Sequence, residues 1–286
     1  MKFNSKRILV TGANGFIGRH LCKTLYSSGA YVFGMVRQIH KNECYLSEQY
    51  TANIYDQQAI NRVIEEVKPE IVIHLAGEKQ RARDIAGYRT NYETNLIGSL
   101  NLIEACQKEV NLRAFLYIGS CEEYGLHQPP FDEDMREEPV STYGVTKLAV
   151  TQLLQTLTRV SSFPAIILRP SFVYGPGQST DMFIPDLIKT LLSGAEFEMT
   201  LGEQTRDFVY IDDVLDAIMK ACYLESLGGQ VVNISSNSPV YINELAKNIA
   251  NMISPATIKL LKIGAKPYRP SETMNYWANN TLALEL

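Results

Sequence analysis

The amino-acid sequence predicts an α/β fold, in which helices cover both faces of a doubly wound parallel sheet. Short apolar segments typical of buried strands alternate with segments whose apolar residues recur at helical spacing. The segment 71–77 is apolar almost throughout, as parallel strands are when both of their faces are buried. The strand predicted at 7–10 precedes a glycine-rich turn and a helix, a succession typical of nucleotide-binding sheets. These three observations together predict the fold class.

The composition agrees with this class and excludes several others. The chain has 286 residues, of which 45% are hydrophobic and 20% are charged, and its net charge is -4. No basic run indicates a nucleic-acid partner, and no apolar run has the length of a membrane span. The five cysteines form no CxxC pair and the four histidines are scattered. We therefore expect reduced thiols, a cytoplasmic location and no metal site.

A glycine-rich turn follows the strand predicted at 7–10. Its glycines have the spacing G-x-x-G-x-x-G, and a helix through Leu25 follows. Glycine lets the backbone approach a pyrophosphate, and a helix N-terminus supplies N–H groups that bind it. The alternative is a tight turn that needs glycine only for its positive φ. We assign the turn to a dinucleotide, and the residues predicted to contact it are Gly12, Asn14, Gly15, Phe16, Ile17 and Gly18.

The strand predicted at 31–36 is followed by Arg37 and by no acidic residue. An acidic residue at this distance from the glycines binds the ribose hydroxyls of NAD, whereas an arginine suits the 2′-phosphate of NADP. Arg37 therefore favours NADP over NAD, and the alternative is a solvated arginine after a strand. A third strand is predicted at 50–54. The other residues that we assign to the cofactor lie at or near the ends of these strands: Asn53, Ile54, Leu75, Ala76 and Gly77.

The rest of the chain continues the alternation. Helices are predicted at 57–67, 91–108, 141–160, 182–192 and 242–253, and strands at 114–118 and 231–234. His74, inside the strand at 71–77, is expected to be packed or bonded to the backbone. An acidic loop that contains prolines occupies 127–140.

Tyr143 and Lys147 lie four residues apart in the helix predicted at 141–160. That spacing places both side chains on one face of the helix, one turn apart. An ammonium group close to a phenol stabilises the phenolate, so Tyr143 is a candidate proton donor or acceptor. Such a pair is common on helix surfaces, and the other motifs must decide its meaning.

Ser120, Glu122 and Glu123 follow the buried strand at 114–118. Ligands of open parallel sheets bind beyond the carboxyl ends of the strands. Ser120 is therefore placed to bond a substrate oxygen. The two glutamates are either acid/base groups or plain loop carboxylates.

Several motifs occur together in one order. They are the glycine turn, Ile73-His-Leu-Ala76, Asn95-Leu-Ile-Gly98, Ser120–Gly125, Tyr143-x-x-x-Lys147, Arg169–Gly177 and Arg206–Asp213. As a set they resemble the extended short-chain dehydrogenase/reductases, which include nucleotide-sugar epimerases, dehydratases and reductases. The resemblance covers nearly the whole chain. It implies a Rossmann-like domain at 1–170, to which 205–235 return, and a smaller, interleaved and mainly substrate-binding part at 171–286.

The resemblance also implies roles for single residues. Tyr143 would be the catalytic acid/base, and Lys147 would assist it and hold the nicotinamide ribose of the cofactor. Ser120 would bond the reacting oxygen of the sugar. Arg206 and Arg269 would bind the substrate diphosphate, because guanidinium groups fit phosphate oxygens; the alternative for each is a surface ion pair.

Cys121 and Glu122 complete the predicted substrate residues, with Ser120. Glu122 matches a glutamate of the dehydratases that form 4-keto-6-deoxy sugars, where such a group takes the C5 proton. Cys121 falls on a position that varies among those enzymes and is aspartate in some. Glu122 is therefore counted among the catalytic candidates too.

Three reactions of this family compete. We favour the NADPH-dependent reduction of the 4-keto group of a nucleotide-diphosphate-linked 6-deoxyhexos-4-ulose. Arg37 suits a cofactor that is consumed and exchanged, and the segment 122–125 resembles reductases of the GDP-4-keto-6-deoxymannose type. A 4,6-dehydratase, supported by Glu122, and a 4-epimerase, which normally retains NAD, are the alternatives.

A non-enzymatic NADP-binding scaffold or sensor is the alternative from another class. It would not need the set Ser120, Tyr143 and Lys147. Related proteins often dimerise through two long helices, here 91–108 and 141–160, so a homodimer is expected.

Overall fold

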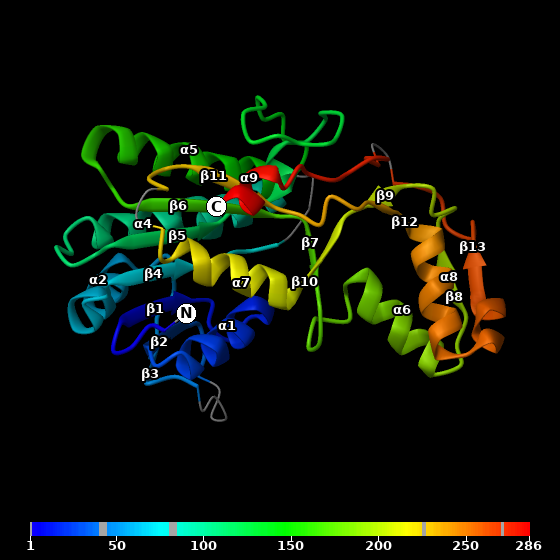
Figure 1. Cartoon of the computed structure of the whole chain (residues 1–286), viewed down its shortest axis with the longest axis horizontal. Helices are drawn as coiled ribbons and strands as arrows, with labels where there is room; N and C mark the ends of the chain where they lie inside the picture. Colours follow the sequence, from blue (N-terminus) through cyan, green and yellow to red (C-terminus); the bar gives the residue numbers. More distant parts are fainter. Residues whose placement is uncertain (1, 40–44, 80–84, 225–226, 270–271) are drawn as a thin grey trace.

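The protein is described by a computed structural model that covers residues 2–39, 45–79, 85–224, 227–269 and 272–286. Figure 1 shows a larger body of sheet and helices, in which the N-terminal half of the chain lies, beside a smaller body. Among the described residues, no helix combines the length and the apolar character needed to cross a membrane.

The larger body is built on a parallel sheet of seven strands in the order β11-β6-β5-β4-β1-β2-β3. The strands are β1 (Arg7–Thr11), β2 (Tyr31–Val36), β3 (Glu48–Thr51), β4 (Ile71–His74), β5 (Ala114–Ile118), β6 (Ala165–Pro170) and β11 (Val231–Ile234). The order of the strands reverses between β1 and β4, and ligands of doubly wound sheets bind at this position. The predicted fold class is confirmed.

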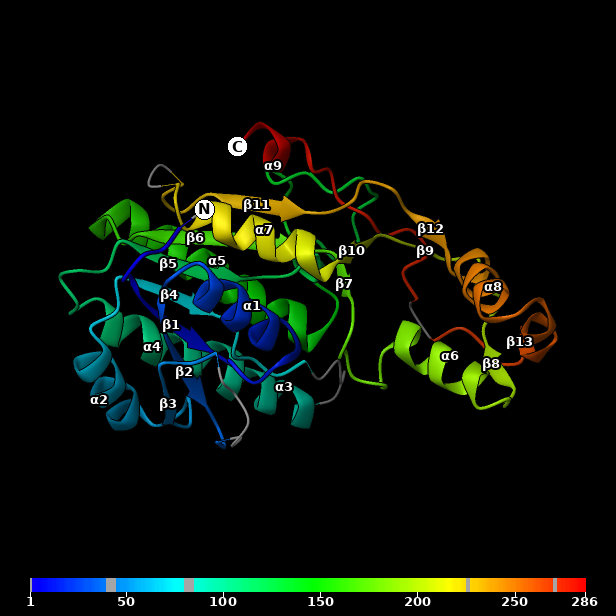
Figure 2. The same ribbon diagram turned by 60° about the horizontal axis from the view of Figure 1, so that its bottom comes forward.

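Helices cover both faces of this sheet (Figure 2). The helices are α1 (Phe16–Ser27) and α7 (Ile211–Ala221) on one face, and α2 (Gln57–Val67), α4 (Gly98–Cys106) and α5 (Thr142–Ser161) on the other. Successive residues of a strand face opposite sides, so Ile8 and Val10 pack toward α1 and α7 while Leu9 packs toward α2. Both faces are thus buried, which explains the apolar strands.

Several predicted elements have other limits in the structure. The predicted strand 50–54 is β3, which ends at Thr51, and the predicted strand 71–77 ends at His74. The predicted helix 91–108 is divided into α3 (Ile85–Asn91), the π-helical turn η1 (Tyr92–Ile97) and α4. In η1 the amide of Asn95 bonds the backbone of Glu78, so a tertiary contact accompanies the local change of winding.

The smaller body has a separate core between α6 (Phe183–Leu192), α8 (Ile242–Ile253) and β8 (Phe197–Met199). The remaining elements of the second half are β7 (Phe172–Tyr174), β9 (Thr205–Arg206), β10 (Phe208–Tyr210), β12 (Val240–Tyr241), η3 (Pro255–Leu260), β13 (Leu261–Ile263) and α9 (Thr281–Glu285). Strand β8 pairs with β13, β7 with β10 and β9 with β12.

The chain crosses between the two bodies more than once. After β10 it returns to the larger body as α7 and β11, and α9 lies against β11. The proposed division at residue 170 with a return at 205–235 stays a prediction.

Candidate active site

The glycine turn after β1 is packed too tightly for side chains. Gly12 has φ +68°, and a Cβ on it would lie 2.9 Å from the backbone nitrogen of Ala76. A Cβ on Gly18 would lie 2.2 Å from the carbonyl oxygen of Gly12. The turn therefore stacks directly on the end of β4, and α1 approaches β1 closely, as a nucleotide-binding turn requires.

The N-terminus of α1 fits an anionic ligand. Its N-cap is Gly15, which makes no side-chain capping bond, and the first turn contains no acidic residue. The first N–H groups of a helix lack partners within the helix and carry partial positive charge. Together with the tight glycine turn, they form a cradle that fits the pyrophosphate of a dinucleotide.

The other predicted cofactor residues differ in their exposure. Leu75 and Ala76 are held beside the glycine turn, since their N–H groups donate to the Thr11 carbonyl (3.3 Å) and hydroxyl (3.1 Å). Arg37 is exposed directly after β2. Ile54 is buried and touches the helix at Gly98, so its side chain is a packing residue.

His74 is buried at the end of β4. It was expected to be packed or bonded to the backbone, and its ring bonds two side chains instead of the backbone. Its ring nitrogens lie 2.7 Å from the hydroxyl of Thr11 and 2.9 Å from that of Ser99. Burial, with a smaller contribution from the nearby charge of Lys147, lowers the pKa of His74 to about 3. The ring is thus a neutral structural link between β1, β4 and α4.

Lys147 reaches from α5 to the ends of β4 and β5. Its side chain is buried, and Nζ donates to the carbonyl of Ile118 at 2.8 Å. Nζ also lies 5.7 Å from the ring centroid of Tyr143 and 4.8 Å from that of Tyr117. A Cβ on Gly77 would lie 3.6 Å from Nζ. The ammonium thus stands at the sheet edge where a dinucleotide bound to the glycine turn would extend.

Ser120 and Glu122 form the start of a short turn, η2 (Cys121–Glu123), after β5. The hydroxyl of Ser120 accepts a bond from the N–H of Glu122 at 3.1 Å. The carboxylate of Glu122 accepts one from the hydroxyl of Ser141, which is the N-cap of α5 and also accepts from the N–H of Gly144. Ser141, which the sequence analysis did not select, thus joins the loop after β5 to the helix of Tyr143.

Cys121 does not fit the substrate role that its position suggested. The thiol is fully buried, lies 3.3 Å from the carbonyl of Arg169 and 3.6 Å from the hydroxyl of Ser171, and packs with Tyr124 and Phe131. Burial raises the pKa of Cys121 to about 12. The side chain is a packing residue beneath the loop, since alternate residues of the turn face inward.

Glu123, for which the sequence left open an acid/base role or a plain loop carboxylate, is paired with Arg169, to which the sequence analysis gave no role. Both side chains are completely buried, and the guanidinium lies 2.7 Å from the carboxylate. The second partner of Arg169 is Glu137, at 2.8 Å, in the acidic loop. A glutamate and an arginine at the carboxyl ends of neighbouring strands were the only signal in the sequence.

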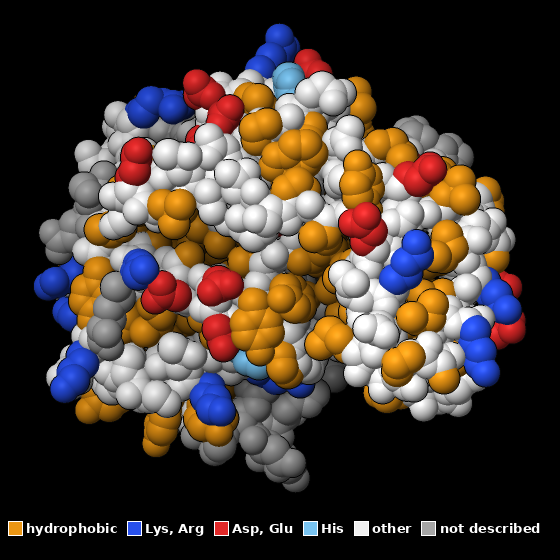
Figure 3. All heavy atoms as spheres, turned by 45° about the vertical axis from the view of Figure 1, so that its right-hand side comes forward, with side chains coloured by type: hydrophobic (Ala, Val, Ile, Leu, Met, Phe, Trp, Pro, Cys, Tyr) orange, Lys and Arg blue, Asp and Glu red, His pale blue; other side chains and the backbone are white. Residues whose placement is uncertain are grey.

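A cavity of about 840 Å³ lies between the two bodies. Glu122 and Ser141 line it on the side of the larger body, and Arg206, Lys266 and Arg269 line it on the other side. Figure 3 shows this region, where hydrophobic and charged side chains meet along the boundary of the two bodies. Such a volume is within the range of small-molecule sites.

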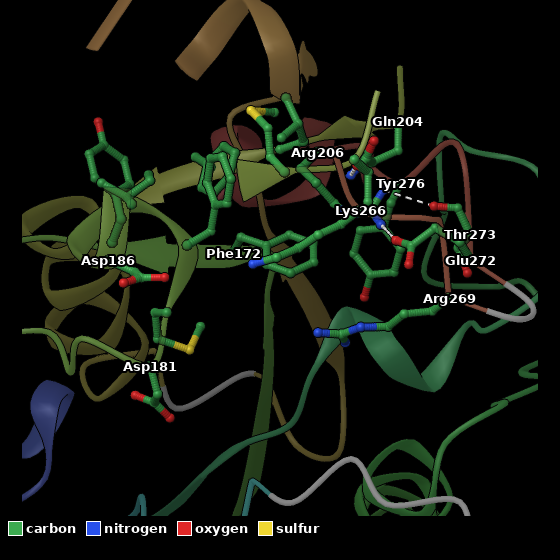
Figure 4. A pocket seen from close by; sticks show the side chains of 18 of the residues that line it. Phe172, Asp181, Asp186, Gln204, Arg206, Lys266, Arg269, Glu272, Thr273 and Tyr276 are labelled. Carbon is green, nitrogen blue, oxygen red and sulfur yellow. Dashed lines mark hydrogen bonds and ion pairs between the residues drawn. The ribbon is translucent and has the colours of Figure 1, made fainter. Parts of the chain in front are cut away.

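The basic side chains of this cavity are engaged to different degrees. Arg206 donates to the carbonyls of Thr205 and Thr273 and forms an ion pair with Glu272. In Figure 4 the charged ends of Lys266 and Arg269 point into the middle of the cavity, opposite Asp186. The structure therefore brings both predicted arginines together and adds Lys266, which the sequence analysis did not select.

Direct contacts also join α1 and the segment after β4 to the second half of the chain. Arg19 donates to the carbonyl of Gly177 at 3.2 Å, and His20 bonds that of Pro176 at 2.8 Å. Lys79 and Asp181 form an exposed ion pair at 2.8 Å. These contacts join α1 and the segment after β4 to the segment that follows β7.

Comparison with known proteins decides the family. The model of the NAD-dependent epimerase/dehydratase family matches residues 8–235, which contain the turn, η2 and the Tyr143–Lys147 pair. The chain belongs to this family. This confirms the resemblance seen in the motifs.

Related proteins within the family act on nucleotide sugars. UDP-glucose 4-epimerase of Thermotoga maritima, solved with UDP-glucose, is 28% identical with a TM-score of 0.88, over 97% of this chain and 91% of that one. UDP-glucuronic acid 4-epimerase of Bacillus cereus, solved with UDP-glucuronic acid and NAD, is 28% identical with a TM-score of 0.86, over 98% and 92%. A dTDP-glucose 4,6-dehydratase of Haemophilus influenzae is 29% identical over 86% of this chain and 79% of its own length.

Proposed function

We propose that the chain binds an NAD(P) cofactor and a nucleoside diphosphate hexose, and that it acts at C4 of the sugar as a 4,6-dehydratase. The observation that carries the choice of reaction is the carboxylate of Glu122. It lines the cavity and is held by Ser141 at the start of the helix that contains Tyr143. The relatives described above are 4-epimerases and a 4,6-dehydratase, so they support this alternative better than the 4-keto reduction favoured from the sequence.

The cofactor would be held by the turn from Gly12 to Gly18 and by Lys147. When bound, a nicotinamide dinucleotide supplies and takes back a hydride. Tyr143 would exchange the proton of the 4-hydroxyl group, with the charge of Lys147 close by to favour the phenolate. The hydroxyl of Ser120 accepts from a backbone N–H, so its own proton is free to bond the same sugar oxygen.

Dehydration needs more than the chemistry at C4. Loss of water across C5 and C6 needs a base for the C5 proton and an acid for the departing 6-hydroxyl. Glu122 can serve both needs, since a carboxylate that takes the first proton can return it to the leaving oxygen. Cys121 offers no second acid, because its thiol is buried and directed away from the cavity. A 4-epimerase needs no such carboxylate, which is why Glu122 favours dehydration.

A specific observation keeps 4-keto reduction as the second candidate. Arg37 stands exposed where an acidic residue would bind the ribose of NAD, which favours NADP and a cofactor that exchanges. The cavity and its basic side chains suit the substrates of either reaction equally.

The experiment is product analysis by NMR with a panel of UDP-, dTDP-, CDP- and GDP-hexoses, with and without added NAD or NADP. We expect a 4-keto-6-deoxy product from one of them. Glu122→Gln should abolish formation of this product. Glu138→Gln, which removes an exposed carboxylate of the acidic loop 127–140, should not. A C4 epimer as the only product would contradict dehydration. Oxidation of NADPH only with a 4-keto sugar would establish the reductase.

A further inference from the structure

The adjacent residues Glu122 and Glu123 face opposite ways. The carboxylate of Glu122 lines the cavity, whereas that of Glu123 is completely buried. The short turn η2 causes this difference, because its Ser120 N-cap and Glu123 form a capping box that draws the second carboxylate back under the loop. Glu123 therefore does not contact a substrate, and its charge is enclosed in the core.

The hydrogen bonds described for the carboxylate of Glu123 join it to Ser120, to α5 and to β6. Oε1 accepts from the backbone N–H of Ser120 at 2.9 Å. Oε2 accepts from the hydroxyl of Thr151 at 2.9 Å and from Nε of Arg169 at 2.9 Å. A Cβ on Gly119 would lie 2.5 Å from Oε1, so the carboxylate occupies the space that a side chain would fill there. A buried pair with such contacts is rigid.

The first consequence concerns Ser120. Its N–H is held by Glu123, and its Oγ accepts from the N–H of Glu122. The backbone N–H and the side-chain oxygen of Ser120 are thus both held, and together they set the direction of its hydroxyl group. The carboxylate of Glu123 thereby controls where Ser120 presents its proton.

The second consequence concerns Lys147. The titratable groups facing it are Tyr143 on its own helix, Tyr117 on β5, His74 on β4 and Glu123 on η2. Of these groups, Glu123 is the only carboxylic acid, and its Oε2 accepts from the hydroxyl of Thr151, one turn after Lys147 on α5. Burial lowers the pKa of Lys147 to about 8, and the charge of Glu123 opposes that effect.

We propose that Glu123 is a positioning residue of the reaction, which fixes Ser120 and maintains the positive charge of Lys147 from within the core. The carboxylate acts through these two residues and does not contact the sugar. The role in catalysis rests on the proposed function, whereas the effect on Lys147 is independent of it.

The first test therefore needs no substrate. The 13Cε signals of labelled lysine are titrated in the whole protein, and Lys147 is assigned by its loss in Lys147→Met. We expect Lys147 to titrate about one pH unit lower in Glu123→Gln than in the natural chain. Glu137→Gln is the matched control, because it removes the other carboxylate of Arg169 but does not touch Ser120. Equal titration in Glu123→Gln and the natural chain, or equal shifts in both variants, would overturn the electrostatic part.

The second test measures turnover against pH. In Glu123→Gln we expect kcat to fall at least about 10-fold with unchanged dinucleotide affinity, and the alkaline limb to move to lower pH. The sign follows because loss of a negative charge makes Lys147 lose its proton more easily. Glu137→Gln should keep the natural kcat and pH profile. A natural kcat and profile in Glu123→Gln would refute the positioning role.

A milder variant covers the case in which Glu123→Gln does not fold. Thr151→Val keeps the carboxylate and removes one of its donors. We expect kcat to fall severalfold with no change in the titration of Lys147. An unchanged kcat would contradict the proposal. If the natural chain converts no sugar of the panel, the lysine titration still decides the electrostatic part.

Discussion

At the scale of single residues, the site depends on how Lys147 is held. Its ammonium bonds the carbonyl of Ile118, which fixes the side chain at the end of β5. The ring of Tyr143, one turn earlier on α5, remains half-buried beside it. The spacing of four residues predicted this approach. The depth of the lysine was not predictable, because it depends on β4 and β5, which are distant in the chain.

Tyr143→Phe tests the role of the phenol. The variant keeps the ring and removes only the group that exchanges a proton, so kcat should fall at least about 100-fold. The affinity for the dinucleotide, measured by fluorescence titration, should stay within about twofold. Tyr88→Phe, at an exposed tyrosine of α3, is the control and should have natural activity. Natural turnover in Tyr143→Phe would remove the catalytic assignment.

Arg37→Ala tests the choice between the two cofactors. Loss of a charged bond to a 2′-phosphate should weaken NADPH binding about 10-fold or more, because such bonds contribute about 1.5–3 kcal/mol. NADH binding should change little. Arg62→Ala, at an exposed arginine of α2, controls for net charge. Equal losses for both cofactors would mean that Arg37 does not recognise the phosphate.

The positioning contacts that the sequence did not reveal share a cause. Glu123, Asn95 and Ser141 bond the backbone or side chains of segments distant in the chain. A motif places a residue near a site but does not tell which of two neighbouring glutamates faces inward. That distinction depends on the φ and ψ of the loop and on the buried Arg169.

At the scale of elements, the close packing of β1, the glycine turn and α1 decides whether a dinucleotide can bind. Gly18→Ala would place a Cβ 2.2 Å and 2.7 Å from two backbone oxygens, which cannot move independently. We expect a loss of about 1–3 kcal/mol in the free energy of unfolding and weaker dinucleotide binding. Urea denaturation and fluorescence titration measure the two effects.

Gly228→Ala is the control for this prediction, since its Cβ would first meet a side-chain carbon of Thr158 at 3.4 Å. It should change the free energy of unfolding by less than about 0.5 kcal/mol. Similar losses in the two variants would show that the packing of the turn is not the cause.

Elements with a strong pattern were predictable, and those shaped by tertiary contacts were not. The helix at 57–67 and the strands at 31–36 and 114–118 have the predicted limits, because their burial pattern is local and regular. The helix predicted at 91–108 failed because propensity does not reveal a π-helical turn. Asn95 in that turn bonds Glu78 and Thr146 in two other segments.

At the scale of the whole molecule, the buried His74 makes stability depend on pH. Its folded pKa of about 3 lies well below the ordinary value of 6.5, so the unfolded chain takes up a proton first as the pH falls. This contribution is complete above pH 6.5 and is lost as the pH falls toward 3. We expect it to steepen the loss by up to ~1.4 kcal/mol per pH unit.

Urea denaturation between pH 7 and pH 4 checks this prediction. His74→Gln should be less stable at pH 7, because it disturbs the bonds to Thr11 and Ser99, but should lose stability less steeply with acid. His20→Gln, outside the sheet, should keep the natural slope. A natural slope in His74→Gln would place the acid sensitivity elsewhere.

The sheet and its two covering layers were predictable as a whole, but the cavity was not. The alternation of elements and the glycine turn are local signals, and they determine the larger body. The cavity wall combines segments from η2 to the residues near 270, which no spacing rule brings together. Arg206 and Arg269 were found only through the resemblance of their motifs. The homodimer expected through the two long helices stays a prediction.

The opposite directions of Glu122 and Glu123 constrain how this loop can evolve. Because the two residues are consecutive, deletion of the residue before Glu122 would move Glu123 to the position that faces the cavity and Glu122 to the buried position before it. The acid of the cavity would then be enclosed in the core, and the counterion of Arg169 would be exposed to the substrate. The length of this segment is therefore under the same constraint as its two glutamates.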